Sequence, residues 1–206
     1  GVVGAARQGC RMVSAMMMAG AVWASVVVGA GEPAADQGGK KEVFPGVRVE
    51  RGGEGKAGVV EFDGEVIADL SDPKKVLYLE VLACPRDSKE HEALVMTKVK
   101  PSQVHAAMLL AGFVPGKPVA WGADGKASAP TGDAVTVEFV WKEGEEEKRV
   151  PALDWVVNAK DGTRASALGK GFVFAGSVMV KRGDGTERYD ADSAGTLVGL
   201  AGSLLG

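Results

Sequence analysis

The segment Val76-Leu-Tyr-Leu-Glu-Val-Leu-Ala-Cys84, followed at once by Pro85, determines the predicted fold class of this chain. Apolar residues take every second position on one side of the segment: Leu77, Leu79, Val81 and Ala83. Because successive side chains of a β-strand point to opposite faces, this alternation predicts a strand. Proline cannot donate a hydrogen bond to a neighbouring strand, so Pro85 is expected to end it.

The residues that follow predict a second strand and one helix. The second strand covers His91–Val99, and with the first it is expected to form a hairpin with a long loop at residues 85–90. The helix covers Pro101–Ala111, because proline suits a first helical turn and Gly112 suits the left-handed residue after the last turn. Its apolar residues have the i, i+3, i+4, i+7 spacing of one helix face: Val104, Ala107, Met108 and Ala111.

Alternating apolar residues predict further short strands outside this centre. They cover Val47–Glu50, Val59–Asp69, Ala134–Trp141 and Lys148–Leu153, and a last hairpin joins Gly171–Lys181 to Thr186–Asp190. Three aromatic residues are expected to anchor the core: Trp121, Trp141 and Trp155. The sequence therefore predicts an α+β fold that is β-rich, with mostly antiparallel strands and one principal helix near residues 101–111.

The first thirty residues have the composition of a secretory signal. Arg7 and Arg11 are the only charged residues before Glu32, and the apolar run Met12–Ala30 carries no charge. Val28-Gly29-Ala30 supplies small residues at the usual spacing for cleavage. The alternative is an uncleaved membrane anchor, since this run approaches the roughly 20 apolar residues that span a bilayer.

These features predict the organisation and the location of the chain. We expect a signal segment at residues 1–30, a flexible linker at 31–42 and a single globular domain at 43–206. The protein is accordingly expected to be exported, to the periplasm or outside the cell. Cleavage after Ala30 would leave Cys84 as the only cysteine, so the domain would have no internal disulfide.

The charge of the chain limits the kinds of partner. The formal net charge is −3, and no basic patch or stripe of the kind that binds nucleic acid is present. Contact with a membrane is expected only through an uncleaved signal segment. The expected partner is therefore an unknown protein or another component of the cell envelope.

Three residues, Cys84, His91 and His105, are the only candidates for chemistry. In the expected hairpin Cys84 would lie opposite His91, with Cβ atoms roughly 4.5–5.5 Å apart. Such a contact would lower the pKa of the thiol or begin a metal site that His105 completes. The alternative is that Cys84 is simply buried, as free cysteines often are. Three ligands are too few for a closed zinc site, and no cofactor is predicted.

Several segments carry a resemblance to a known family. They are Leu82-Ala83-Cys84 with Lys89-Glu90-His91-Glu92, Lys100-Pro101-Ser102-Gln103-Val104-His105 with Gly112, Phe172-Val173-Phe174-Ala175-Gly176-Ser177, and Tyr189-Asp190-Ala191-Asp192-Ser193-Ala194-Gly195-Thr196. Together they resemble the YdjY-type domain of exported bacterial proteins. The resemblance implies export and a domain from about residue 43 to 200, with no established activity. Some members of the family are described as iron–sulfur proteins, but a cluster needs about four thiolates, which this chain lacks.

Two hypotheses on function follow from the sequence. The first is an exported, non-catalytic module that has a structural role or binds a partner, because no complete set of catalytic residues is found. The second is a thiol- or metal-dependent activity centred on Cys84 and His91. Burial of Cys84 among apolar side chains would favour the first, and a position in a polar cleft would favour the second.

Overall fold

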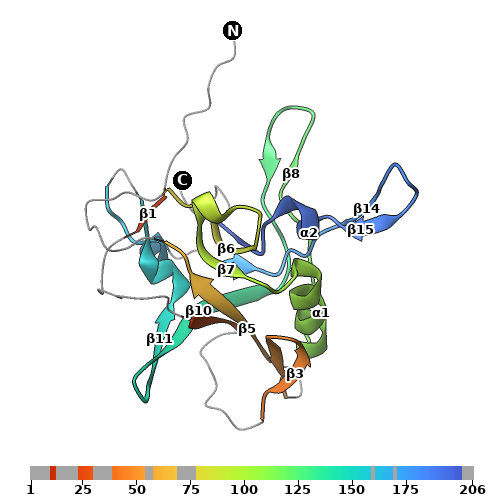
Figure 1. Ribbon diagram of the computed structural model, residues 1–206. Coiled ribbons are helices and arrows are strands. Elements are labelled where there is room, and N and C mark those ends of the chain that lie inside the picture. The colour runs from red at the N-terminus through yellow and green to blue at the C-terminus, as the bar shows by residue number, and fades with distance from the viewer. Residues whose placement is uncertain are drawn as a thin grey trace.

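The computed structural model describes residues 10–12, 23–29, 39–53, 58–68, 78–158, 161–168 and 171–200. The strands are β1 (Cys10–Met12), β2 (Trp23–Gly29), β3 (Lys41–Phe44), β4 (Val47–Glu50), β5 (Val59–Val66), β6 (Val81–Pro85), β7 (Ala93–Thr97), β8 (Ala120–Trp121), β9 (Ala127–Ser128), β10 (Ala134–Glu143), β11 (Glu146–Pro151), β12 (Val156–Asn158), β13 (Phe172–Val173), β14 (Met179–Lys181), β15 (Glu187–Tyr189) and β16 (Val198–Gly199). The helices are α1 (Pro101–Ala111) and α2 (Ala191–Ala194), and single 3₁₀ turns are η1 (Glu90–Glu92), η2 (Ala152–Trp155) and η3 (Ala165–Leu168). The predicted β-rich α+β class is confirmed (Figure 1).

One large sheet organises the described residues. Its main path runs β11-β10-β2-β5-β7-β6-β16, while β3, β4 and β13 attach beside it. Strand β5 is the branching point, because one of its edges pairs with β2 and the other pairs first with β4 and then with β7. Every pairing is antiparallel except that of β6 with β7.

Helix α1 closes one face of this sheet over β4 and β5 (Figure 1). Its bounds and its buried face agree with the prediction, since Val104, Ala107, Met108 and Ala111 are all buried. Gly112 follows with a φ of 96°, the left-handed conformation that ends a helix. The apolar stripe packs into the main core, whose largest fully buried side chains are Phe62 and Phe139.

Most predicted strands outside this centre are confirmed. Strands β4, β5, β10 and β11 fall within or close to the ranges expected from alternation. The last hairpin is present as β14 and β15, but Phe172–Val173 pairs with β10 instead of extending it. Residues 76 and 77 of the first predicted strand lie outside the described residues.

The pairing of β6 with β7 differs from the hairpin that the sequence predicts. The two strands are parallel, and Cys84 pairs with Met96. Residues 86–92 carry the chain back along β6 before β7 begins. Extended backbone covers up to about 3.3–3.6 Å per residue, so this connection is long enough to return along a strand of similar length. The alternation of apolar residues identified the strands, but it does not indicate whether two paired strands run parallel or antiparallel.

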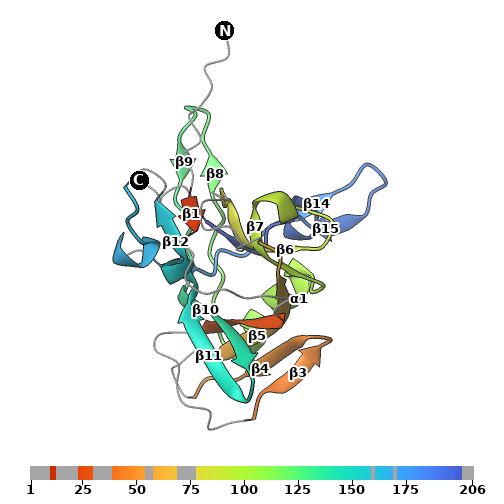
Figure 2. The ribbon, with the colours of Figure 1, turned by 60° about the vertical axis from the view of Figure 1, so that its left-hand side comes forward.

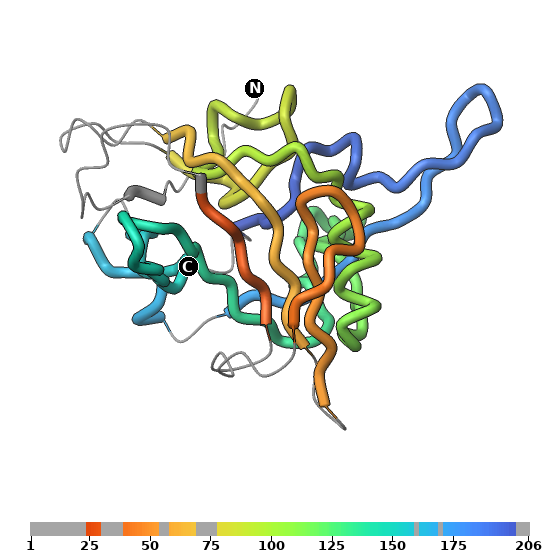
Figure 3. Tube along the Cα trace, turned by 60° about the horizontal axis from the view of Figure 1, so that its bottom comes forward, coloured from red at the N-terminus to blue at the C-terminus, as the bar shows by residue number. Residues whose placement is uncertain are grey.

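Part of the predicted signal segment appears in the sheet. Strand β2 lies between β5 and β10, although residues 23–29 belong to the apolar run assigned to the signal (Figure 3). Most other residues of that segment lie outside the described residues. Among the described residues, no helix has the length and apolar character to cross a bilayer.

Candidate functional site

Cys84 is a buried strand residue. Its side chain is 0% exposed, and it packs with Val81 and Ala93 in a small apolar cluster beside the main core. Burial raises the pKa of the Cys84 thiol, because the charged thiolate is poorly solvated there. A raised pKa opposes the thiolate form, which is the reactive one.

His91 lies apart from this thiol in the strand register. It belongs to η1, between β6 and β7, and its side chain is 77% exposed. Its Nε2 atom lies 3.8 Å from the carboxylate of its neighbour Glu92. The expectation that Cys84 faces His91 across a hairpin is wrong, since Met96 takes that position in the parallel register. Among the described residues, no group of three His, Cys, Asp or Glu side chains is arranged to hold a metal ion.

His105 contacts residues that are far from it in the sequence. Its Nδ1 atom lies 2.9 Å from the hydroxyl of Tyr189, far away in sequence. Its ring also packs at tilted angles against Phe174 and Tyr189, with centroids 5.0 and 5.2 Å away. Burial lowers the pKa of His105, while burial and the charge of Asp192 raise the pKa of Tyr189. Near pH 7 the contact therefore joins a neutral imidazole to a neutral phenol.

A glycine allows the chain to pass close to His105. Gly176 has a φ of 68°, which favours glycine over other residues. A Cβ atom at this position would lie 3.2 Å from the Cβ of Pro115 and 3.3 Å from the Cε1 of His105. We call the group formed by His105, Pro115, Phe174, Gly176 and Tyr189 the hairpin root.

Two hairpins leave this root. The first holds β8 and β9, and at its base the backbone N–H of Gly116 donates to the carbonyl of Phe174. The second holds β14 and β15, and its last residue is Tyr189. Figures 1 and 2 show that both hairpins extend beyond the body of the molecule.

A second contact connects α1 with the segment after β15. The carboxylate of Asp192 accepts hydrogen bonds from the backbone N–H of Ser102 at 2.8 Å and from its hydroxyl at 2.7 Å. The first N–H groups of a helix have no partner within the helix, so this carboxylate caps α1. Helix α1 therefore contacts the C-terminal part of the domain twice, through His105 with Tyr189 and through Ser102 with Asp192.

The hairpins carry large apolar side chains in solvent. Trp121 is 76% exposed, Met179 58% and Val178 51%, and Val114 at the base of the first hairpin is 63% exposed. The prediction that Trp121 anchors the core is therefore wrong, whereas Trp141 is buried and Trp155 stacks on it and on Phe139. The short β8 strand has both its residues exposed, so its Trp has no core to enter.

The hairpin root was missed from the sequence, although its parts were singled out. His105, Phe174, Gly176 and Tyr189 all lie in segments that carry the family resemblance. Their convergence depends on contacts between residues up to 84 positions apart, which local patterns do not predict. The local sequence signal of a close approach was the glycine of Phe174-Ala175-Gly176, because glycine permits the positive φ that the structure has there.

Comparison with known proteins identifies the family of this chain. The molecule is a β-rich α+β domain that presents two hairpins from a common root. The family model described as YdjY domain matches residues 54–196, more than half of the chain, so the chain belongs to the YdjY domain family. No significant match is found among curated proteins or solved structures.

Proposed function

We propose that this protein is an exported, non-catalytic module that binds a protein partner in the cell envelope through its two hairpins. The observation that carries the proposal is the exposure of Trp121 and Met179 on hairpins that project from the body. Single exposed apolar residues are common on protein surfaces. Tryptophan and methionine are, however, enriched in protein interfaces, and tryptophan is enriched among the residues that dominate binding energy.

The hairpin root supports this proposal by holding both hairpins in place. The tilted ring contacts of His105 with Phe174 and Tyr189 hold the base of each hairpin against α1. A surface that is ordered before binding loses less conformational entropy when the partner arrives. The root is therefore a positioning element, and the exposed side chains on the hairpins make the contact.

The burial of Cys84 also supports a non-catalytic role. A thiol that is fully buried and has a raised pKa is poorly suited to nucleophilic or redox chemistry. The other proposed partner in such chemistry, His91, is exposed on the loop between β6 and β7. No observation among the described residues favours a thiol- or metal-dependent activity.

Substitution on the hairpins tests the proposed binding. In the full chain, the double variant Trp121→Ser/Met179→Ser should lose its partner, measured as protein recovered with the tagged chain from the envelope fraction. Leu168, which is 38% exposed on η3, provides the matched control Leu168→Ser. Because all three side chains are exposed, none of these variants should change the melting temperature appreciably. Equal recovery with the double variant and the control would contradict the proposal.

The export part of the proposal rests on the signal-like composition of residues 1–30 and on the resemblance stated for the family. Fractionation of cells that express the full chain with a C-terminal tag tests it. We expect the tag outside the cytoplasm, and removal of Arg7 and Arg11 from the charged start should slow export. Recovery of the wild-type chain in the cytoplasm alone would contradict this part.

A further inference from the structure

Residues 23–29 have two roles that conflict if the chain is cut after Ala30. In the sequence they belong to the apolar run of the predicted signal segment. In the structure they form β2, which lies between β5 and β10 in the middle of the sheet (Figure 3). Removal of β2 would separate β10 and β11 from β5, because β2 alone joins them along the main path of the sheet.

The backbone of β2 is paired along both edges. Seven residues, from Trp23 to Gly29, pair with β5 in antiparallel register, and Ser25 to Gly29 also pair with β10. The hydroxyl of Thr136 adds a hydrogen bond to the carbonyl of Gly29 at 3.1 Å. A strand with two paired edges leaves few backbone groups for water, so its release exposes two strand edges at once.

The side chains of β2 match the surfaces on either side of it. Val26 is 0% exposed, and its register partners are Phe62 on β5 and Phe139 on β10, both also fully buried. Val28 is buried in the same way between Val60 and Val137. We call the space between β5 and β10 that β2 fills the slot. On one face of β2, the slot surrounds every second side chain with apolar residues.

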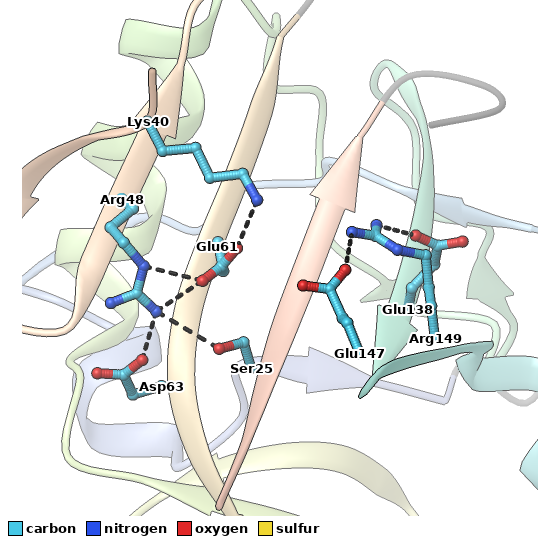
Figure 4. Close-up of polar contacts among 8 residues, drawn as sticks. All are labelled: Ser25, Lys40, Arg48, Glu61, Asp63, Glu138, Glu147 and Arg149. Carbon is cyan, nitrogen blue, oxygen red and sulfur yellow. Dashed lines mark hydrogen bonds and ion pairs between the residues drawn. The ribbon is translucent and has the colours of Figure 1, made fainter. Parts of the chain in front are cut away.

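The opposite face of β2 carries Ser25 and Val27 beside the charged side chains of the neighbouring strands, and Val27 is buried in register between Glu61 on β5 and Glu138 on β10. Ser25 Oγ lies 3.4 Å from a guanidinium nitrogen of Arg48, which also forms ion pairs with Glu61 and Asp63 of β5 (Figure 4). On the other side, Arg149 pairs with Glu138 of β10 at 2.7 Å. This face of the strand therefore holds both a hydroxyl, at Ser25, and a buried apolar side chain, at Val27.

The region matched by the family model includes β5 and β10 but leaves out β2, together with β3 and β4. It covers both β5 and β10 but begins at residue 54, after β2 has ended. The two strands that form the slot are thus part of the matched domain, and the strand that fills it comes from outside.

We propose that the slot between β5 and β10 is a strand-binding site whose occupant is Trp23–Gly29, and that this strand stays bound when the chain is cut after Ala30. The chemistry of recognition is that of strand addition: main-chain hydrogen bonds on both edges, with Val26 and Val28 entering the core from one face of the strand. The segment thus acts as a structural strand in addition to any role in export. The inference is independent of the partner proposed for the hairpins.

Cutting the folded full chain tests the inference. A protease recognition site placed within residues 31–38 allows the purified protein to be cleaved without removing any residue of β2. We expect the N-terminal fragment to elute with the rest of the domain in size-exclusion chromatography, and to separate only in denaturant. Separation of the fragment under native conditions would overturn the inference, whatever the state of the remaining domain.

Two variants show whether the slot is what retains the fragment. Val26→Thr keeps the shape of the side chain but buries a hydroxyl, and it should speed release of the cut fragment by about tenfold or more. Ser25→Ala, on the other face of the same strand, should change the release rate by less than about threefold. Both changes are small enough for the uncut chain to fold, which circular dichroism verifies. Equal release rates for the two variants would show that the fragment is held elsewhere and overturn the inference.

Discussion

At the scale of single residues, the state of Cys84 decides between the two hypotheses on function. The thiol is fully buried and its pKa is raised, so we expect a thiol reagent to modify the native protein more than about tenfold slower than the unfolded protein. The measurement is the reaction rate in a Cys10→Ser background, so that only Cys84 is observed. His91→Ala should leave this rate unchanged. Fast modification of the native protein that His91→Ala slows would restore the thiol hypothesis.

His105 makes a second prediction at this scale, on the pH dependence of stability. Burial lowers the pKa of His105 below its ordinary value of 6.5, so the unfolded chain takes up the proton before the folded one. The free energy of unfolding should therefore fall as the pH drops from about 7 toward 5. In His105→Gln this fall should be smaller, as measured by urea denaturation at several pH values.

The exposed histidine serves as the control for this measurement. His91→Gln removes a histidine that is exposed and lies outside the hairpin root, and it is the matched control for His105→Gln. A wild-type stability that is flat between pH 7 and 5 would contradict the half-buried, neutral state of His105.

At the scale of elements, the contact between α1 and the segment at α2 makes its own prediction. Asp192→Ala removes the carboxylate that accepts two hydrogen bonds from Ser102 at the start of α1. We expect the free energy of unfolding to fall by about 1 kcal/mol, as on loss of a helix cap. Glu143→Ala, a matched loss of an exposed carboxylate at the end of β10, should change it by less than about 0.5 kcal/mol. Equal effects in thermal or chemical denaturation would show that the cap contributes nothing.

Elements with a strong local pattern were predictable from the sequence. Helix α1 was predicted with its correct ends because Pro101, Gly112 and its apolar stripe are all local signals. Strand β10 was predicted because its apolar residues alternate over most of its length. The parallel pairing of β6 with β7 was missed because the direction of a neighbouring strand is set by tertiary packing. Strand β2 was missed because an apolar run that suits a signal segment also suits a strand buried on both faces.

At the scale of the whole molecule, the candidate site forms where segments that are distant in the sequence meet in the fold. No single sequence motif defines it. The three residues named from the sequence as chemically reactive turn out to have unrelated environments: a core, a solvent-exposed turn and the hairpin root. The features that suggest binding are the two projecting hairpins, whose exposed Trp121 was expected in the core. Whether a side chain is exposed is decided by the assembled fold. Tryptophan is usually well buried, and for this reason Trp121 was wrongly expected in the core.

The central claim is that the two hairpins form the surface that a protein partner contacts. The most direct test is photo-crosslinking in living cells, with benzoylphenylalanine incorporated in the full chain in place of Trp121, Met179 or Leu168. We expect both hairpin positions to give a crosslinked species of the same added mass, and position 168 on η3 to give none. Absence of a crosslink at both hairpin positions, or the same species at all three, would contradict it.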